Sequence, residues 1–171
     1  NAFRRALTAF LLAGLWVAAP VAAAPPERVL VFTKTAKFRH DAIPVAVTTL
    51  QRLVVDEGMA ADHTEDALVF TLENLARYRV VVFASTTGDV LEDAQQAALE
   101  AFVRKGGGFI GVHAAADTEY DWPWYGQLVG AYFQNHPPGL QSTQVQPEKD
   151  GKPVGPRWPI TDELYNYRAN P

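Results

Sequence analysis

The sequence predicts an α/β fold, in which a parallel β-sheet lies between two layers of helices. Two observations support this prediction. Short runs of apolar, β-branched residues are typical of buried strands, and segments with apolar residues at helical spacing separate them along the chain. Strands that alternate with helices form βαβ units, whose parallel strands are covered on both faces.

The first half of this pattern begins with an apolar strand at residues 28–33 and a loop at 34–41. A helix follows at 42–57, where apolar residues recur every three or four positions and Gly58 provides a C-terminal cap. The next segment, 62–66, is polar and contains only a weak strand, and a short helix is expected at 72–77.

The second half is more regular. A buried strand at 78–84 leads through a polar turn at 85–89 into a strongly amphipathic helix at 92–105. Gly106-Gly107-Gly108 then precedes a strand at 109–112. Because these glycines lie between a helix and a strand, and not between a strand and a helix, they are interpreted as a helix cap and not as a phosphate-binding loop.

Residues 1–24 are expected to be a secretory signal peptide. Arg4 and Arg5 precede an apolar stretch of about fourteen residues, short for a bilayer span, and the small residues before Pro25 suit cleavage near Ala23. The alternative is an uncleaved membrane anchor. Either way the domain at 25–171 is expected outside the cytoplasm, periplasmic or secreted, with no stable membrane span once the signal is cleaved.

Composition excludes several classes of function. The chain has 171 residues and no cysteine, which excludes disulfides, thiolate metal sites and a cysteine nucleophile. Without Arg4 and Arg5, 13 basic residues face 19 acidic ones, so nucleic acid is not an expected partner.

Three loops are expected on one rim of the sheet, because ligands of such sheets bind beyond the carboxyl ends of the strands. The first loop runs to His40, the second contains Thr86 and Thr87, and the third begins with His113. His113 ends a buried strand and precedes three alanines, which indicates an elbow-like turn that presents one side chain. Its imidazole could act as base, acid or metal ligand, or simply form a hydrogen bond at the sheet edge. His40 is equally open to interpretation as an exposed loop residue, and His63 is expected to be solvated.

A cluster of aromatic residues follows Asp117 and Thr118. Tyr120, Trp122 and Trp124 could stack against a sugar ring or pack into the core. His136 follows this cluster and could supply a third imidazole. Two histidines and a carboxylate are enough for a catalytic metal site, but the spacing is scattered and contains no compact ligand motif. Beyond His136, only residues 143–145 alternate weakly, and no closing strand or helix is expected.

Several segments together resemble the ThuA-like (trehalose-utilisation) family. They are residues 29–41, 64–66, 82–90, 106–118, 120–125 and 161–167. The resemblance implies a flavodoxin-like, three-layer fold of the class I glutamine-amidotransferase-like superfamily, incomplete at its C-terminus, with an exposed sheet edge. The elbow that holds cysteine in the amidotransferases holds His113 here, so thiolate chemistry is unavailable. The family pattern matches His40, His113, His136 and Glu163.

These observations lead to a hypothesis of exported carbohydrate chemistry. A small sugar of the trehalose or 3-keto-disaccharide type would undergo a lyase, hydrolase or isomerase reaction, with His113, His40 and Glu163 as catalytic groups. Substrate contacts are expected from a set of seven residues: Thr86, Thr87, Asp117, Thr118, Tyr120, Trp122 and Trp124. A zinc-like ion on His40, His113 and His136, and a homo-oligomer, are left open. The alternatives are a non-catalytic carbohydrate-binding module and a scaffold fragment without ligand.

Overall fold

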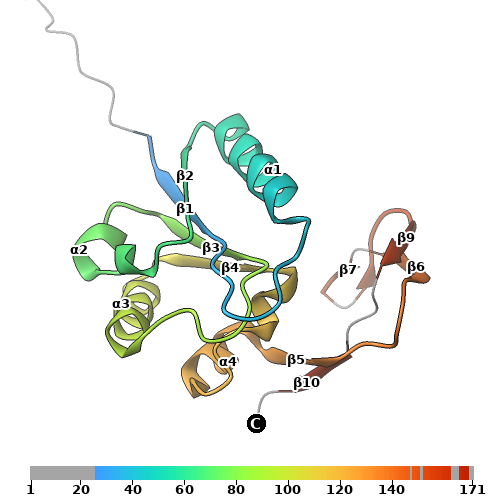
Figure 1. Cartoon of the computed structure of the whole chain (residues 1–171). Coiled ribbons are helices and arrows are strands. Elements are labelled where there is room, and N and C mark those ends of the chain that lie inside the picture. Colours follow the sequence, from blue (N-terminus) through green and yellow to red (C-terminus); the bar gives the residue numbers. More distant parts are fainter. Residues whose placement is uncertain (1–25, 147, 151, 163–165, 170–171) are drawn as a thin grey trace, which may run out of the picture.

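The centre of the molecule is a four-stranded, fully parallel sheet in the order β2-β1-β3-β4 (Figure 1). The computed structural model describes residues 26–146, 148–150, 152–162 and 166–169, so the expected leader and Glu163 lie outside the described residues. The strands are β1 (Arg28–Phe32), β2 (Ala60–Thr64), β3 (Val80–Ala84) and β4 (Gly108–Val112). The α/β prediction and its three clear strands are confirmed.

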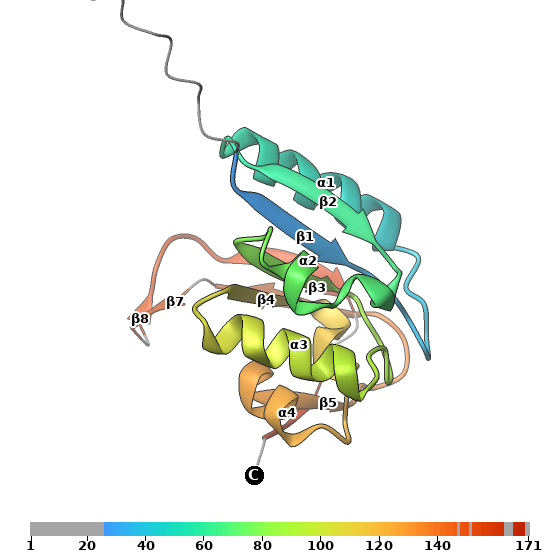
Figure 2. The same cartoon turned by 90° about the vertical axis from the view of Figure 1, so that its left-hand side faces the viewer.

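Helices cover both faces of this sheet, as Figures 1 and 2 show. Helix α1 (Ile43–Asp56) lies on one face, where Leu50 and Val54 pack against Val29, Val31 and Val82. The other face holds the larger core and the remaining helices. These are α2 (Leu72–Leu75), α3 (Asp93–Arg104), α4 (Pro123–Val129) and the 3₁₀ turns η1 (Ala67–Val69) and η2 (His113–Asp117).

The helix ends follow the glycine signals in the sequence. Gly58 and Gly106 come directly after the C-cap residues of α1 and α3 and have φ angles of +76° and +95°. These are left-handed conformations, which glycine adopts without the steric cost of a Cβ. The interpretation of Gly106-Gly107-Gly108 as a cap is therefore confirmed.

Strand β2 begins two residues earlier than the expected 62–66 segment. Its sequence, Ala-Ala-Asp-His-Thr, has no apolar run because β2 forms an edge of the sheet and pairs only with β1. Arg28 on β1 donates to both carboxylate oxygens of Asp62 at 2.6 Å, and Tyr78 also donates to this carboxylate at 2.8 Å. The hydrogen bonds from Arg28 hold the pKa of Asp62 below its ordinary value.

The chain after α4 forms three small antiparallel pairs. β5 (Ala131–Asn135) pairs with β10 (Asn166–Ala169), β6 (Gln141–Val145) with β9 (Trp158–Asp162), and β7 (Glu148–Lys149) with β8 (Lys152–Pro153). Figure 1 shows β6, β7 and β9 to one side of the parallel sheet. The expectation of no closing strand was wrong, because these strands have only two to five residues and lack the continuous apolar runs on which the prediction depended.

None of the helices in the described ranges combines the length and the apolar character that a bilayer crossing requires.

Candidate functional site

Three loops meet beyond the carboxyl ends of β1, β3 and β4, as the parallel sheet predicts. Thr35 pairs with Thr87, and Gly88 pairs with Thr118, in isolated parallel bridges that extend the sheet past its regular strands. The bridges are closed by hydrogen bonds from the Ala36 N–H to the Thr87 carbonyl (2.7 Å) and from the Gly88 N–H to the Asp117 carbonyl (2.8 Å). The rim is therefore a connected backbone surface.

His113 stands at this rim on strained backbone. It is the first residue after β4 and has a φ angle of +54°, in the left-handed region. This conformation costs a residue with a Cβ about 1–3 kcal/mol, and such residues cluster at functional sites. The side chain is exposed. The elbow that the sequence predicts is present, with an imidazole in the presented position.

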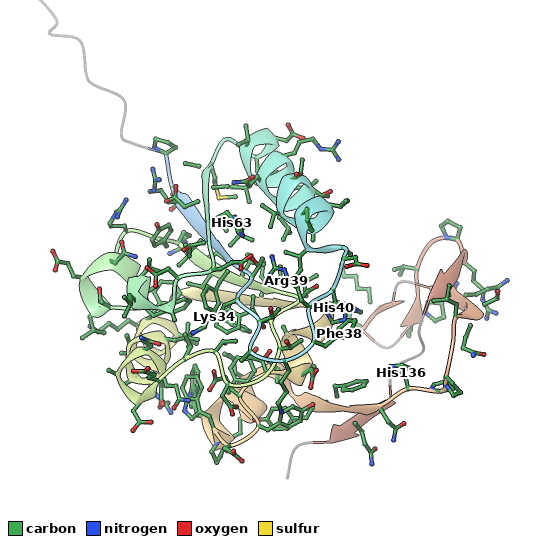
Figure 3. The ribbon with its side chains drawn as sticks, viewed as in Figure 1. Lys34, Phe38, Arg39, His40, His63 and His136 are labelled. Atoms are coloured by element: carbon green, nitrogen blue, oxygen red, sulfur yellow. The ribbon has the colours of Figure 1, made fainter. Side chains whose placement is uncertain are left out.

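His40 meets His113 at the rim. Their ring centroids are 4.6 Å apart with an interplanar angle of 76°, an edge-to-face contact. The His40 ring also meets Phe38 edge-to-face, at 4.9 Å and 87°, and Figure 3 shows these two side chains together. Two loops that are 73 positions apart in the sequence therefore place two imidazoles against each other.

The three candidate threonines connect the rim loops through hydrogen bonds. Thr86, Thr87 and Thr118 have no exposed surface. The hydroxyls of Thr86 and Thr118 are 2.8 Å apart, and Thr87 donates to the carbonyl of Phe38 at 2.7 Å. Their hydroxyls are thus engaged with protein groups, and their contribution to the rim is to fix its shape.

Asp117 and Tyr120 lie together and are half-buried. The Tyr120 hydroxyl is 2.6 Å from an Asp117 carboxylate oxygen and 2.8 Å from the carbonyl of Phe133. The Lys37 ammonium lies 5.4 Å from the centre of the Tyr120 ring. Tyr120 therefore connects the turn after β4 to β5 and to the loop that carries His40.

Trp122 and Trp124 favour the packing interpretation of the aromatic cluster. Their rings lie 4.9 Å apart, and Trp122 stacks on the buried Tyr125 at 5.9 Å. Both are partly buried against the main core. Tyr125 itself donates to the carbonyl of Ala115 at 2.8 Å, which supports the turn that begins with His113, and burial raises the pKa of its hydroxyl well above the ordinary value.

The expected three-histidine metal set is not assembled in the described part of the chain. His136 lies on the segment that leaves β5 (Figure 3), its Nδ1 is 2.9 Å from the Pro137 carbonyl, and its ring faces Phe133 at 6.0 Å. No group of three or more His, Cys, Asp or Glu side chains suited to a metal ion occurs among the described residues. The described residues therefore do not form the ligand set that a bound zinc ion requires.

Two side chains outside the expected catalytic set have clear structural roles. His63 is exposed, as expected, and its Nε2 atom lies 2.8 Å from the hydroxyl of Thr33. Glu119 is buried, with one carboxylate oxygen accepting the N–H groups of Val90 and Leu91 at 2.7 and 2.8 Å. The parallel register of β1 and β2 could have suggested the first contact, but nothing in the sequence marks the second.

A hollow of about 330 Å³ borders His113 and is otherwise lined by small or apolar residues. They are Phe109, Gly111, Ala115, Ala116, Leu128 and Val129. A larger hollow of about 680 Å³ lies along β2 and is lined by Arg28, Asp62, His63 and their neighbours. We place the candidate site at His113 and not at the larger hollow, because the smaller hollow reaches an imidazole at the rim where the three loops converge.

Comparison with known proteins agrees with this architecture. The sequence profile of the family described as "ThuA: Trehalose utilisation" matches residues 28–171. The chain belongs to the ThuA family. At the level of the family, this supports a role in trehalose utilisation.

Two solved structures share the fold. A ThuA-like protein from Bacteroides uniformis ATCC 8492 is 24% identical, with a TM-score of 0.68 over 87% of this chain and 64% of its own. A ThuA-like protein from Parabacteroides merdae ATCC 43184 is 20% identical, with a TM-score of 0.60 over 85% of this chain and 64% of its own. The chain thus spans just under two thirds of these relatives. No curated protein matches it.

Proposed function

We propose that this chain is an exported carbohydrate-processing domain in which His113 and His40 exchange protons with a sugar. The observation that carries the proposal is the edge-to-face pair of imidazoles, 4.6 Å apart, at the carboxyl ends of the strands. The trehalose-utilisation family supports a sugar as the substrate. The composition of residues 1–24 supports export, which the N-terminal residue of the processed chain, read by mass spectrometry, would test.

The proposed chemistry uses one imidazole as a base and the other as an acid. Imidazole is the side chain that carries out both general base and general acid catalysis most often. Neutral His113 would take a proton from the carbon next to a sugar carbonyl, while protonated His40 would donate a proton to the carbonyl oxygen. The product is an enediol, and its collapse gives isomerisation or, with a leaving group on the next carbon, elimination.

Asp117, Tyr120 and Glu163 complete the proposed site. Asp117 and Tyr120 are half-buried at the same rim and are the substrate contacts that we favour. Glu163, outside the described residues, is proposed as a carboxylate partner.

Turnover of a 3-keto-disaccharide by the full chain tests the proposal. His113→Gln should lower kcat by about a hundredfold or more and leave KM nearly unchanged, because general acid–base catalysis contributes about that much. His63→Gln is the matched control, since its ring contacts Thr33 and not His113, and it should retain full activity.

Equal kcat values for His113→Gln and the unmodified chain would overturn the assignment of His113. Saturable sugar binding without turnover by the unmodified chain would instead favour the non-catalytic carbohydrate-binding module.

A further inference from the structure

The aromatic side chain of Phe38 is exposed to solvent. Its exposed fraction is 68%, and among the large apolar side chains that are exposed in the described ranges it is the one aromatic member. The others are aliphatic: Val45, Leu53, Val55, Leu68, Leu72, Ile110, Leu140 and Val154. An exposed aromatic ring is most readily explained where it serves recognition.

The backbone on both sides of Phe38 is fixed. Its carbonyl accepts the hydroxyl proton of Thr87 at 2.7 Å, and two residues earlier the Ala36 N–H donates to the Thr87 carbonyl. The next residue, Arg39, donates to both carboxylate oxygens of Glu65 at 2.7 and 3.2 Å. A ring on a fixed segment loses little conformational freedom when a ligand binds to it.

The position of the ring connects it to the proposed catalytic pair. Phe38 contacts His40 edge-to-face, and His40 contacts His113 edge-to-face. In an edge-to-face contact at most one face of the phenyl ring is covered, so at least one face stays open to a ligand. A sugar ring stacked on Phe38 would be separated from His40 by no more than the phenyl ring itself, and His113 is the next ring beyond His40 in this series of contacts.

We infer that Phe38 is the stacking platform of the sugar site, and that it holds the C–H face of a pyranose ring beside His40 and His113. The inference rests on the proposed function, because it assigns a substrate contact to the same site. Its chemical basis is the negative face of the aromatic ring, which attracts the weakly positive C–H groups along one side of a pyranose. The hydroxyls on the ring edge would then remain available to the imidazoles.

Titration of the full chain with trehalose, followed by calorimetry and by saturation-transfer NMR, tests the inference. Phe38→Ala should weaken binding about tenfold, the change expected from loss of one aromatic stack. Phe38→Tyr should restore binding to within about threefold, because the face is retained. The melting temperature should stay within about 3 °C, because the ring is exposed.

Leu68→Ala is the matched control. Leu68 is exposed to a similar extent, 74%, but lies on η1, and its truncation should leave trehalose affinity unchanged. Unchanged affinity in Phe38→Ala would overturn the platform while leaving the roles of His113 and His40 intact. Loss of turnover in Phe38→Ala with unchanged affinity would also overturn it. Absence of trehalose binding by the unmodified chain would overturn the platform, whereas the proton-transfer proposal stands or falls with turnover of the 3-keto-disaccharide.

Discussion

Three non-glycine residues with left-handed backbone lie in the segments that follow β3 and β4. Ser85 follows β3 directly, His113 follows β4 directly and Glu119 lies two residues after η2, and each has a φ angle of +54°. Each such residue costs about 1–3 kcal/mol and persists only where neighbouring contacts over-determine it. The rim therefore has a fixed shape at some expense of stability, which is the arrangement expected of a preorganised site.

Glu119 helps to stabilise this strained rim, and its replacement should lower the free energy of unfolding. Its carboxylate accepts the N–H groups of Val90 and Leu91, and its second oxygen accepts the Gln96 side-chain amide at 2.7 Å. Glu119→Ala leaves two buried N–H groups without an acceptor and should lower the free energy of unfolding by about 3 kcal/mol. Glu119→Gln keeps an acceptor and should cost about 1 kcal/mol or less, as measured by urea denaturation.

The pH dependence of these variants provides the control. Burial raises the pKa of Glu119 above its ordinary value, so the folded chain holds this proton more tightly than the unfolded chain. The contribution of Glu119 to stability must then fall as pH rises from its ordinary pKa to the raised one. Relative to the unmodified chain, Glu119→Gln should gain stability over that range. If the difference in stability between Glu119→Gln and the unmodified chain does not change with pH, the raised pKa of Glu119 is contradicted.

The connection between α3 and β4 shows two different uses of glycine in adjacent positions. Gly106 has a left-handed φ angle with open space around it, whereas a Cβ on Gly107 would lie 2.3 Å from the ring of the buried Phe102. Gly106→Ala and Gly107→Ala should each lower the free energy of unfolding by about 1–3 kcal/mol. Adding Phe102→Leu should relieve only Gly107→Ala, which a double-mutant cycle by thermal unfolding would measure.

An interaction energy near zero between Phe102→Leu and Gly107→Ala would show that the ring moves aside freely. The same cycle with Gly106→Ala is the control, and it should be additive because no side chain lies near that position.

The elements that the sequence predicts well are strands with an apolar run and helices with an apolar period and a glycine after their last turn. The boundaries of β1, β3, β4, α1 and α3 lie within two residues of the expected ones. The helix α4 was missed although Pro123 stands at its start and Gly130 at its left-handed end, which are typical helix boundaries. Between these boundaries, Trp124, Tyr125 and Gly126 have low helix propensity, so the segment lacks the pattern of a predicted helix.

The candidate site was predictable only where topology alone determines proximity. His40 and His113 follow strands of one parallel sheet, so their meeting at one edge follows from the strand direction. The contact of Phe38 with His40 depends on the path of an irregular loop, and the burial of Glu119 depends on packing between β3, η2 and α3. Neither has a sequence pattern, because the interactions join positions of unrelated spacing.

The two edges of the sheet differ in chemistry across the whole molecule. β2 carries Asp62 and His63, and charged or polar side chains on an edge discourage pairing with other chains. β4, at the opposite edge, reads Gly-Phe-Ile-Gly-Val and leaves Ile110 50% exposed. On the same face, Val112 packs against the buried cluster of Val29, Val31, Val82 and Ala84, whereas Ile110 is not part of it. The β4 edge therefore has neither charge nor proline to prevent strand addition.

We predict that the chain associates with itself through β4, and that Ile110→Lys suppresses this association. A lysine on an edge strand must lose its hydration if another strand pairs beside it, so the monomer is favoured. Sedimentation velocity over a concentration series should show the unmodified chain shifting to larger species and the variant remaining monomeric, with stability changed by about 0.5 kcal/mol or less.

Leu53→Lys, at 51% exposure on α1, is the matched control and should associate like the unmodified chain. Association of Ile110→Lys equal to that of Leu53→Lys would exclude the β4 edge as the contact, and the interface would then have to lie elsewhere on the surface.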